Sequence, residues 1–140
     1  MGTADAVDML ARVPIFSSLS RRELQAIARQ GKEVRHGEGA VLAREGDAGL
    51  GFFLILEGEA RVTVKGRFRR TLGPGDFFGE ISLLDGGPRT ATVTAATPVR
   101  LLGIAQWAFK RLVDQHPSMA SKMLRAMASR LRASAPKEQI

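Results

Sequence analysis

The sequence predicts a mainly β domain with flanking helices, an α+β fold whose strands form a sandwich, barrel or jelly roll. Short apolar or alternating runs separated by glycines fill residues 32–105, a spacing typical of many short strands. Helical apolar spacing lies before residue 31 and after residue 105. The length of 140 residues suits one domain with one sizeable core.

The N-terminal region predicts two helices. Residues 5–13 form the first, which should stop at Pro14. The second lies in "SLSRRELQAIARQG", where Ser20 and Glu23 have the spacing of a capping box and Gly31 ends the helix. Its apolar stripe consists of Leu24, Ile27 and Ala28.

The β region contains "FFLILEG", "EARVTVKG", "RRTLG", "ATVTA" and "VRLLGI" as its clearest strands. Two helices follow: "AQWAFKRLVDQH", which ends at Pro117, and a longer one from Ser118 to about Ala135. We expect Trp107 in the core. The apolar stripe of the last helix consists of Met119, Met123, Leu124, Met127 and Leu131.

Composition excludes several classes of function. The chain has no cysteine, and His36 and His116 have no partner at metal-ligand spacing, so no metal site is expected. No signal peptide and no membrane span is predicted, and a cytoplasmic location is expected. The net charge of +7 suits phosphate-bearing partners, but the basic residues are scattered along the sequence, which favours a role in solubility.

The stretch "FGEISLLDGGPRTATV" carries the chemistry. Gly79 permits a tight turn, and the four residues Glu80–Leu83 can form one helical turn whose first amides are free for an anion. Arg89 follows a turn and can bring its guanidinium to the same anion. Glu80 would repel a phosphate, so it should serve sugar hydroxyls. The alternative is a polar turn with a surface Glu80–Arg89 pair.

The motifs "FGEISLL" and "PRTATV" resemble the phosphate-binding cassette of cyclic nucleotide-binding domains, and the resemblance extends over nearly the whole chain. It implies an eight-stranded β-roll (jelly roll) with N-terminal helices and two C-terminal helices. Residues 1–140 would form a single domain that binds cAMP or cGMP and needs no other cofactor. Its parts would be N-terminal helices at 1–31, the β-roll at 32–105 with the cassette at 78–91, and hinge and lid helices at 106–135.

The resemblance also implies a role for each cassette residue. Arg89 would hold the exocyclic phosphate together with the Ser82 hydroxyl and the backbone of Ile81 and Ser82. Glu80 would accept a hydrogen bond from the ribose 2′-hydroxyl, with help from the Gly79 backbone.

The base of the nucleotide would meet other residues. Thr90 offers a hydroxyl that suits guanine and does not exclude adenine. Arg130, at the edge of the apolar stripe of the last helix, is the candidate lid contact, although its stem could simply cover that stripe. Val62 and Leu72 are candidate walls for the purine, and a plain core role fits either one.

The predicted function is a non-catalytic cyclic-nucleotide sensor whose last helix rearranges on binding. The alternative is the ligand-binding part of a catabolite-activator-type transcription regulator or of a cyclic-nucleotide-gated channel. Only "PKEQI" follows Ala135, so we expect no direct contact with nucleic acid by this chain. The sequence leaves open the effector, the preference between cAMP and cGMP, and whether the chain is a monomer or a homodimer.

Overall fold

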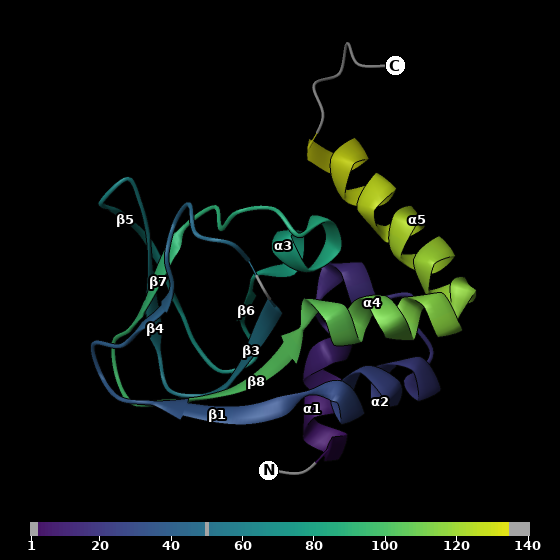
Figure 1. Cartoon of the computed structure of the whole chain (residues 1–140), viewed down its shortest axis with the longest axis horizontal. Helices are drawn as coiled ribbons and strands as arrows, with labels where there is room; N and C mark the ends of the chain where they lie inside the picture. Colours follow the sequence, from purple (N-terminus) through teal and green to yellow (C-terminus); the bar gives the residue numbers. More distant parts are fainter. Residues whose placement is uncertain (1–2, 50, 135–140) are drawn as a thin grey trace.

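A computed structural model of the chain describes residues 3–49 and 51–134. It confirms the α+β fold with an eight-stranded β-roll. In Figure 1 the roll occupies one side of the molecule, and most of the helices pack beside it on the other. The helices are α1 (Thr3–Ala11), the short 3-10 helix η1 (Pro14–Phe16), α2 (Arg21–Gln30), α3 (Glu80–Asp85), α4 (Gln106–Gln115) and α5 (Pro117–Ser134).

The eight strands form two antiparallel sheets of four, with orders β1-β8-β3-β6 and β2-β7-β4-β5. β3 and β8 pair in the middle of the first sheet, from Gly51↔Ala105 onward. The strands are β1 (Lys32–His36), β2 (Val41–Ala43), β3 (Gly51–Glu57), β4 (Ala60–Val64), β5 (Arg67–Leu72), β6 (Phe77–Phe78), β7 (Thr92–Ala95) and β8 (Val99–Ala105).

The core has two parts, and β3 contributes to both because its side chains alternate between the faces of the sheet. Phe52, Leu54 and Leu56 pack against the helices, in the larger cluster. Ile55 points the other way, into the cluster between the two sheets. The first sheet therefore separates the helical layer from the interior of the roll.

The N-terminal helices follow the sequence signals closely. The capping box is present: the Glu23 amide donates to the Ser20 hydroxyl, and the Ser20 amide donates to the Glu23 carboxylate. The first helix ends at Ala11, two residues earlier than expected, and Pro14 begins η1. Proline fits the first helical position because its missing amide hydrogen would have no partner there.

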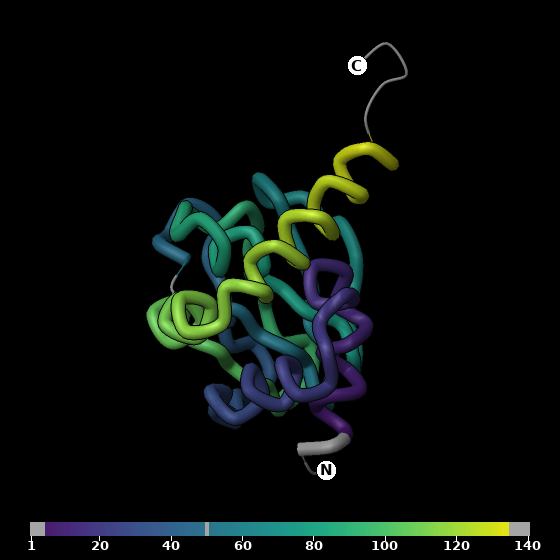
Figure 2. Tube along the Cα trace, turned by 90° about the vertical axis from the view of Figure 1, so that its right-hand side faces the viewer, coloured from purple at the N-terminus to yellow at the C-terminus, as the bar shows by residue number. Residues whose placement is uncertain are grey.

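Helix α5 lies across the N-terminal helices, and its last turns extend beyond the helical layer (Figures 1 and 2). Only its first half is buried, through Met119 and Met123. Two residues of the predicted apolar stripe, Leu124 and Leu131, are each 67% exposed, so the stripe is wrong at these positions. None of the helices described is long and apolar enough to cross a membrane.

Trp107 is also not a core residue, since it is 66% exposed. It is the second residue of α4, a helix whose buried face consists of Ala108, Phe109 and Leu112. The guanidinium of Arg111 lies 5.4 Å from the Trp107 ring centroid and covers part of it. The helical period places positions 108, 109 and 112 inside and position 107 outside.

Candidate functional site

The site begins where β6 ends. Phe78 is the last residue of β6, and Gly79 takes a left-handed conformation, with φ of +88°, at the start of α3. The Leu83 amide donates to the Gly79 carbonyl over 2.9 Å, closing the first turn of α3. Amides ahead of the first helical bond have no partner within their helix and can face an anion. In α3 these amides include those of Ile81 and Ser82.

Arg89 is held by its backbone and by its side chain. Its amide donates to the Asp47 carbonyl over 2.8 Å, and its carbonyl accepts from the Gly46 amide over 2.9 Å. The Nη1 atom donates to the Gly51 carbonyl over 2.7 Å. The guanidinium carbon lies 5.9 Å from the centroid of the Phe53 ring. The loop before β3 and the start of β3 therefore fix the orientation of the Arg89 guanidinium.

Two glycines allow the segments of the site to approach one another. A Cβ atom at Gly79 would overlap Nη1 of Arg89 and would lie 2.6 Å from the Gly51 carbonyl oxygen. A Cβ atom at Gly49 would overlap the Ser82 side chain. Side chains at either position would push the arginine or the serine away, so both glycines are needed for this geometry.

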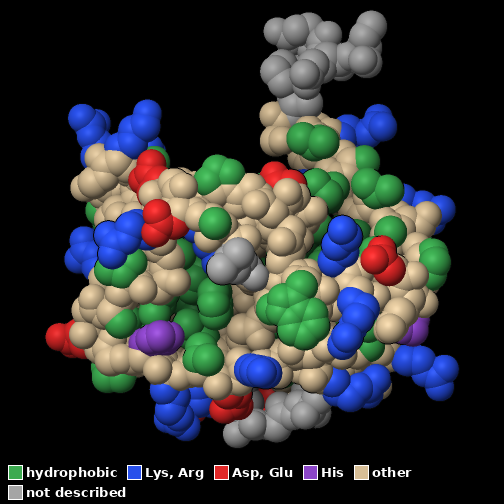
Figure 3. Space-filling view, in the orientation of Figure 1, with side chains coloured by type: hydrophobic (Ala, Val, Ile, Leu, Met, Phe, Trp, Pro, Cys, Tyr) green, Lys and Arg blue, Asp and Glu red, His purple; other side chains and the backbone are tan. Residues whose placement is uncertain are grey.

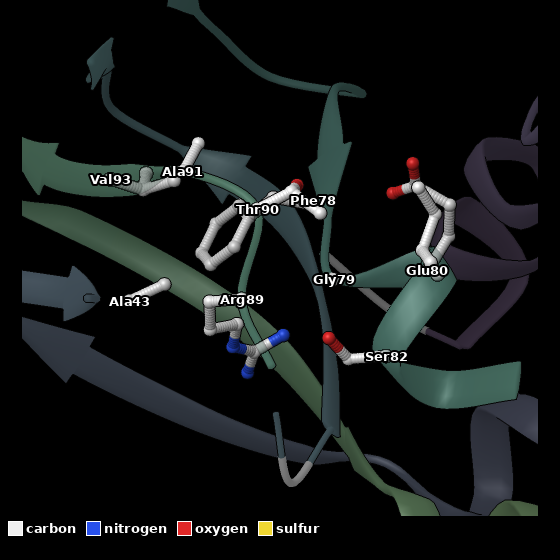
Figure 4. A pocket seen from close by; sticks show the side chains of 10 residues that line it. Ala43, Phe78, Gly79, Glu80, Ser82, Arg89, Thr90, Ala91 and Val93 are labelled. Atoms are coloured by element: carbon white, nitrogen blue, oxygen red, sulfur yellow. The ribbon is translucent and has the colours of Figure 1, made fainter. Parts of the chain in front are cut away.

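These segments enclose a cavity of about 50 Å³ (Figure 4). Six of the nine predicted site residues line it: Gly79, Glu80, Ile81, Ser82, Arg89 and Thr90. In Figure 4 the Arg89 guanidinium and the Ser82 hydroxyl point toward each other, and the Glu80 carboxylate points away from both. The structure thus brings the cassette residues together around one point.

The positive charge of Arg89 is influenced by Glu80 but is not neutralised by an ion pair within the described part of the chain. Its side chain is partly buried, and no residue described forms an ion pair with it. Burial lowers the pKa of Arg89, and the negative charge of Glu80 partly offsets this effect. The alternative of a surface Glu80–Arg89 pair is therefore wrong for this structure.

The other three predicted site residues lie outside the cavity. Leu72 is buried in the core between the sheets, and Val62 packs against that core. Arg130 is exposed near the end of α5 and lines a second cavity, of about 300 Å³. Ile81 lines both cavities, and the second is completed by Met127, Leu131 and Ser134.

Sequence reasoning missed the apolar part of the cavity wall, which comes from Ala43, Phe78, Ala91 and Val93. The alternation in "RTATV" was the available signal for Ala91 and Val93, because inward residues of a strand recur every second position. Ala43 had no signal, since it reaches the site through the pairing of β2 with β7. Among residues 3–49 and 51–134, no group of three acidic, histidine or cysteine side chains could hold a metal ion.

Comparison with known proteins gives a family. Residues 33–116 match the family model described as "Cyclic nucleotide-binding domain". The chain is 30% identical to a CRP-like cAMP-activated global transcriptional regulator of Mycobacterium tuberculosis, over 89% of this chain and 58% of the regulator. It is 40% identical to a cyclic nucleotide-gated potassium channel of Rhizobium etli, over 93% of this chain and 36% of the channel.

A cAMP-dependent protein kinase regulatory subunit of Schizosaccharomyces pombe is 40% identical over 75% of this chain and 26% of that subunit. The chain therefore spans only part of the length of the curated relatives it matches.

Solved structures agree. The N-terminal domain of a transcriptional regulator from Streptomyces coelicolor superposes with a TM-score of 0.82 at 35% identity, covering 91% of this chain and 94% of that domain. The catabolite activator protein of Thermus thermophilus gives a TM-score of 0.70 at 30% identity, covering 86% of this chain and 59% of that protein. The cassette geometry, the β-roll and these likenesses agree, and the chain belongs to the cyclic nucleotide-binding domain family.

Proposed function

We propose that the chain is a sensor that binds cAMP or cGMP in the cavity around Arg89. The observation that carries the proposal is the partly buried guanidinium of Arg89, which forms no ion pair with any residue described. Burial of an unpaired cation is unfavourable, and a bound phosphate would supply the missing negative charge. The phosphate would also reach the free amides at the start of α3.

The family resemblance supplies the remaining roles. Arg89 would hold the exocyclic phosphate, and the amides of Ile81 and Ser82, with the Ser82 hydroxyl, would complete its coordination. Glu80 would accept from the ribose 2′-hydroxyl beside the Gly79 backbone. The Glu80 carboxylate points away from Arg89, which supports separate roles for the two residues: Glu80 at the ribose and Arg89 at the phosphate (Figure 4).

The size of the cavity supports a lid. Its volume of about 50 Å³ is well below the roughly 300–1,000 Å³ of pockets that enclose a whole ligand. It suits the phosphate end, and the base must lie outside it. The second cavity shares Ile81 and reaches Arg130 on α5. We therefore place the base between the cassette and the last turns of α5, with Arg130 as a contact. For Val62 and Leu72 a core role is sufficient.

The ligand preference and the effector are also part of the proposal. The regulator and the kinase subunit among the relatives are named for cAMP, which makes cAMP the first ligand to test. The relatives are regulators and channels, and we propose binding without catalysis, in the cytoplasm, as a monomer or a homodimer. Because the chain spans only part of these relatives, it could equally be the sensor part of a transcription regulator or of a channel.

Calorimetric titration with cAMP and with cGMP tests the proposal, after unfolding and refolding to remove any ligand carried through purification. We expect saturable binding at micromolar concentration or tighter for at least one of them. The open monoester 5′-AMP is the control, since its phosphate is not part of a ring and should fit less well. Absence of binding by both cyclic nucleotides, with the chain folded, would refute the proposal.

A further inference from the structure

The hairpin of β4 and β5 gathers basic residues that are spread out in the sequence. β5 is the last strand of its sheet, so its outer edge has no neighbour within the sheet. Neither β4 nor β5 contains an acidic residue. The basic hairpin, as we name this surface, consists of Arg61, Lys65, Arg67, Arg69 and Arg70, together with Phe68.

All five cations of the basic hairpin are exposed, and none forms an ion pair with another residue described. The Glu45 carboxylate touches the hairpin, since it accepts a hydrogen bond from the Lys65 amide over 2.8 Å. Lys and Arg side chains gather at one upper corner of Figure 3, where Figure 1 places the start of β5. The hairpin therefore presents a concentrated positive charge at one extremity of the molecule.

An aromatic ring lies within this charge. Phe68 is 52% exposed, and the guanidinium of Arg61 lies 4.7 Å from its ring centroid. The alternative to a binding role is that charged side chains on an edge strand have no role other than preventing edge-to-edge aggregation. That role would not place a large apolar side chain on the same exposed edge. The combination of phenyl ring and arginines indicates a binding surface.

The tip of the basic hairpin retains a cation at a conformational cost. Lys65 and Gly66 both have positive φ, 52° and 76°, as a two-residue hairpin turn of the primed kind requires. Asn, Asp or Gly is preferred at the first of these positions, because Gly has no Cβ atom to strain and the short polar side chains of Asn and Asp can hydrogen-bond locally. Lys65 instead carries a positive charge at the tip.

We propose that the basic hairpin docks on an anionic lipid bilayer. Its five cations would contact lipid phosphates and carboxylates, and Phe68 would enter the interface between head groups and acyl chains. A nucleic acid duplex is less suitable, because its phosphate surface would contact the cations but would offer no apolar layer for the exposed Phe68 ring. Docking would hold the sensor at a membrane surface by a site separate from the cavity of Arg89.

Sedimentation of the whole chain with vesicles tests this inference. The vesicles contain three parts phosphatidylcholine to one part phosphatidylserine, in about 0.1 M salt, where charges interact over about 10 Å. We expect binding to these vesicles, little binding to pure phosphatidylcholine, and release at about 1 M salt. Replacing Arg67, Arg69 and Arg70 by Gln should lower the partition coefficient on the order of a hundredfold, at about fivefold for each charge.

The matched control replaces Arg22, Arg125 and Arg132 by Gln, which removes the same charge from exposed helical positions. We expect this variant to bind nearly as the wild type does. If both triple variants lose vesicle binding equally, net charge alone explains the binding, and the proposal is overturned. Phe68→Ser tests the ring separately and should weaken binding by about tenfold. Unchanged binding of Phe68→Ser would overturn the role of the ring.

Two further results would overturn the proposal with the wild-type chain alone. One is equal binding to neutral and anionic vesicles. The other is tighter binding to a short duplex oligonucleotide than to anionic vesicles at the same salt concentration. Calorimetry with cAMP and cGMP on the triple variant separates this inference from the proposed function. If the wild type binds either nucleotide, that binding should persist while vesicle binding is lost.

Discussion

A Cβ atom at Gly79 would overlap Nη1 of Arg89, so the conformation of this glycine and the direction of the arginine depend on each other. Gly79 has φ of +88° and directly precedes α3, while Nη1 of Arg89 donates to the Gly51 carbonyl over 2.7 Å. The guanidinium therefore lies directly against the backbone at the helix start. Alanine substitutions at Gly79 and at Gly75, compared with each other, separate the effect of backbone strain from the effect of a displaced arginine.

Gly79→Ala should weaken cyclic-nucleotide binding by about tenfold or more, because the added methyl group pushes the Arg89 guanidinium out of place. It should also lower the free energy of unfolding by roughly 1 kcal/mol, the usual cost of a left-handed alanine. Calorimetry gives the first quantity and urea unfolding the second.

Gly75→Ala is the control for strain. Gly75 has φ of +90°, and a Cβ atom there would have no neighbour within 4 Å. Its free energy of unfolding should fall by a similar amount while its affinity stays unchanged. Equal losses of affinity in the two variants would show that strain, and not the contact with Arg89, limits binding.

Arg89→Ala should weaken cyclic-nucleotide binding by about 2–4 kcal/mol, because it leaves a phosphate charge without its paired donor. Removing a partly buried cation that has no ion pair should not lower the free energy of unfolding of the unliganded chain by a comparable amount. Arg89→Lys keeps the charge but lacks the planar fork of the guanidinium, so its affinity should lie between those of the wild type and Arg89→Ala. If Arg89→Ala bound cyclic nucleotides as tightly as the wild type, the cavity around Arg89 would not be their binding site.

Thr90→Ala should lower the affinity for cGMP more than the affinity for cAMP. Thr90 lines the cavity and is also exposed, so its hydroxyl can reach the amino group of a guanine that lies outside the cavity. The loss for cGMP should be about 1 kcal/mol, the usual value of one hydrogen bond, or roughly fivefold. Thr90→Ser retains the hydroxyl and should retain the preference. Equal losses for both nucleotides would show that the hydroxyl does not read the base.

The sequence predicted the fold class from local signals, and it predicted the cassette from such signals together with a family resemblance. The capping box of α2 and the glycine-punctuated strands depend on neighbouring residues, and so does the turn between Gly79 and Arg89. The anchor for Arg89 was not predictable, since its carbonyl partner, Gly51, comes from a strand paired elsewhere in the roll. Backbone acceptors of this kind leave no trace in residue type.

Errors arose where an apolar residue was read as buried from its type alone. Leu124 and Leu131 fit a helical stripe, but the second half of α5 extends beyond the layer that would cover them (Figure 1). Glu23 was predicted only as a capping residue. It also binds Lys122 over 2.8 Å and Ser118 over 3.0 Å, and so joins α2 to the start of α5. Such contacts depend on tertiary packing and not on local pattern.

Deletion of residues 129–140 should speed release of the nucleotide by about tenfold without lowering the free energy of unfolding. It removes Arg130, the proposed lid contact, and keeps Met119 and Met123 in the core. A deletion that begins at Ser118 would not be informative, because losing a buried methionine side chain alone costs about 2–5 kcal/mol. Stopped-flow displacement measures the release rate.

Two point variants refine this test. Arg130→Ala should reproduce most of the faster release, and Arg132→Ala, an exposed arginine on the same helix, should leave the rate unchanged. An unaltered rate in both the deletion and Arg130→Ala would mean that the end of α5 does not cover the ligand.

Stability should fall in acid because of Glu23. Burial of this carboxylate opposes its ionisation, but hydrogen bonds from Lys122, the Ser20 amide and Ser118 outweigh burial and lower its pKa to about 2. A carboxylate with a lowered pKa stabilises the folded state above its ordinary pKa of 4.5. We expect its contribution, roughly 2 kcal/mol, to disappear as the pH falls from about 4.5 to about 2.

Urea unfolding at a series of pH values measures this loss. Glu23→Gln should be less stable than the wild type at neutral pH, and the difference should shrink toward pH 2, where the wild-type carboxylate also loses its charge. Glu38→Gln, at an exposed position in the loop after β1, is the control and should follow the wild-type curve. A constant difference between Glu23→Gln and the wild type would mean that the contacts of Glu23 stabilise the fold without regard to its charge. The join between α2 and α5 would then rest on packing and neutral hydrogen bonds.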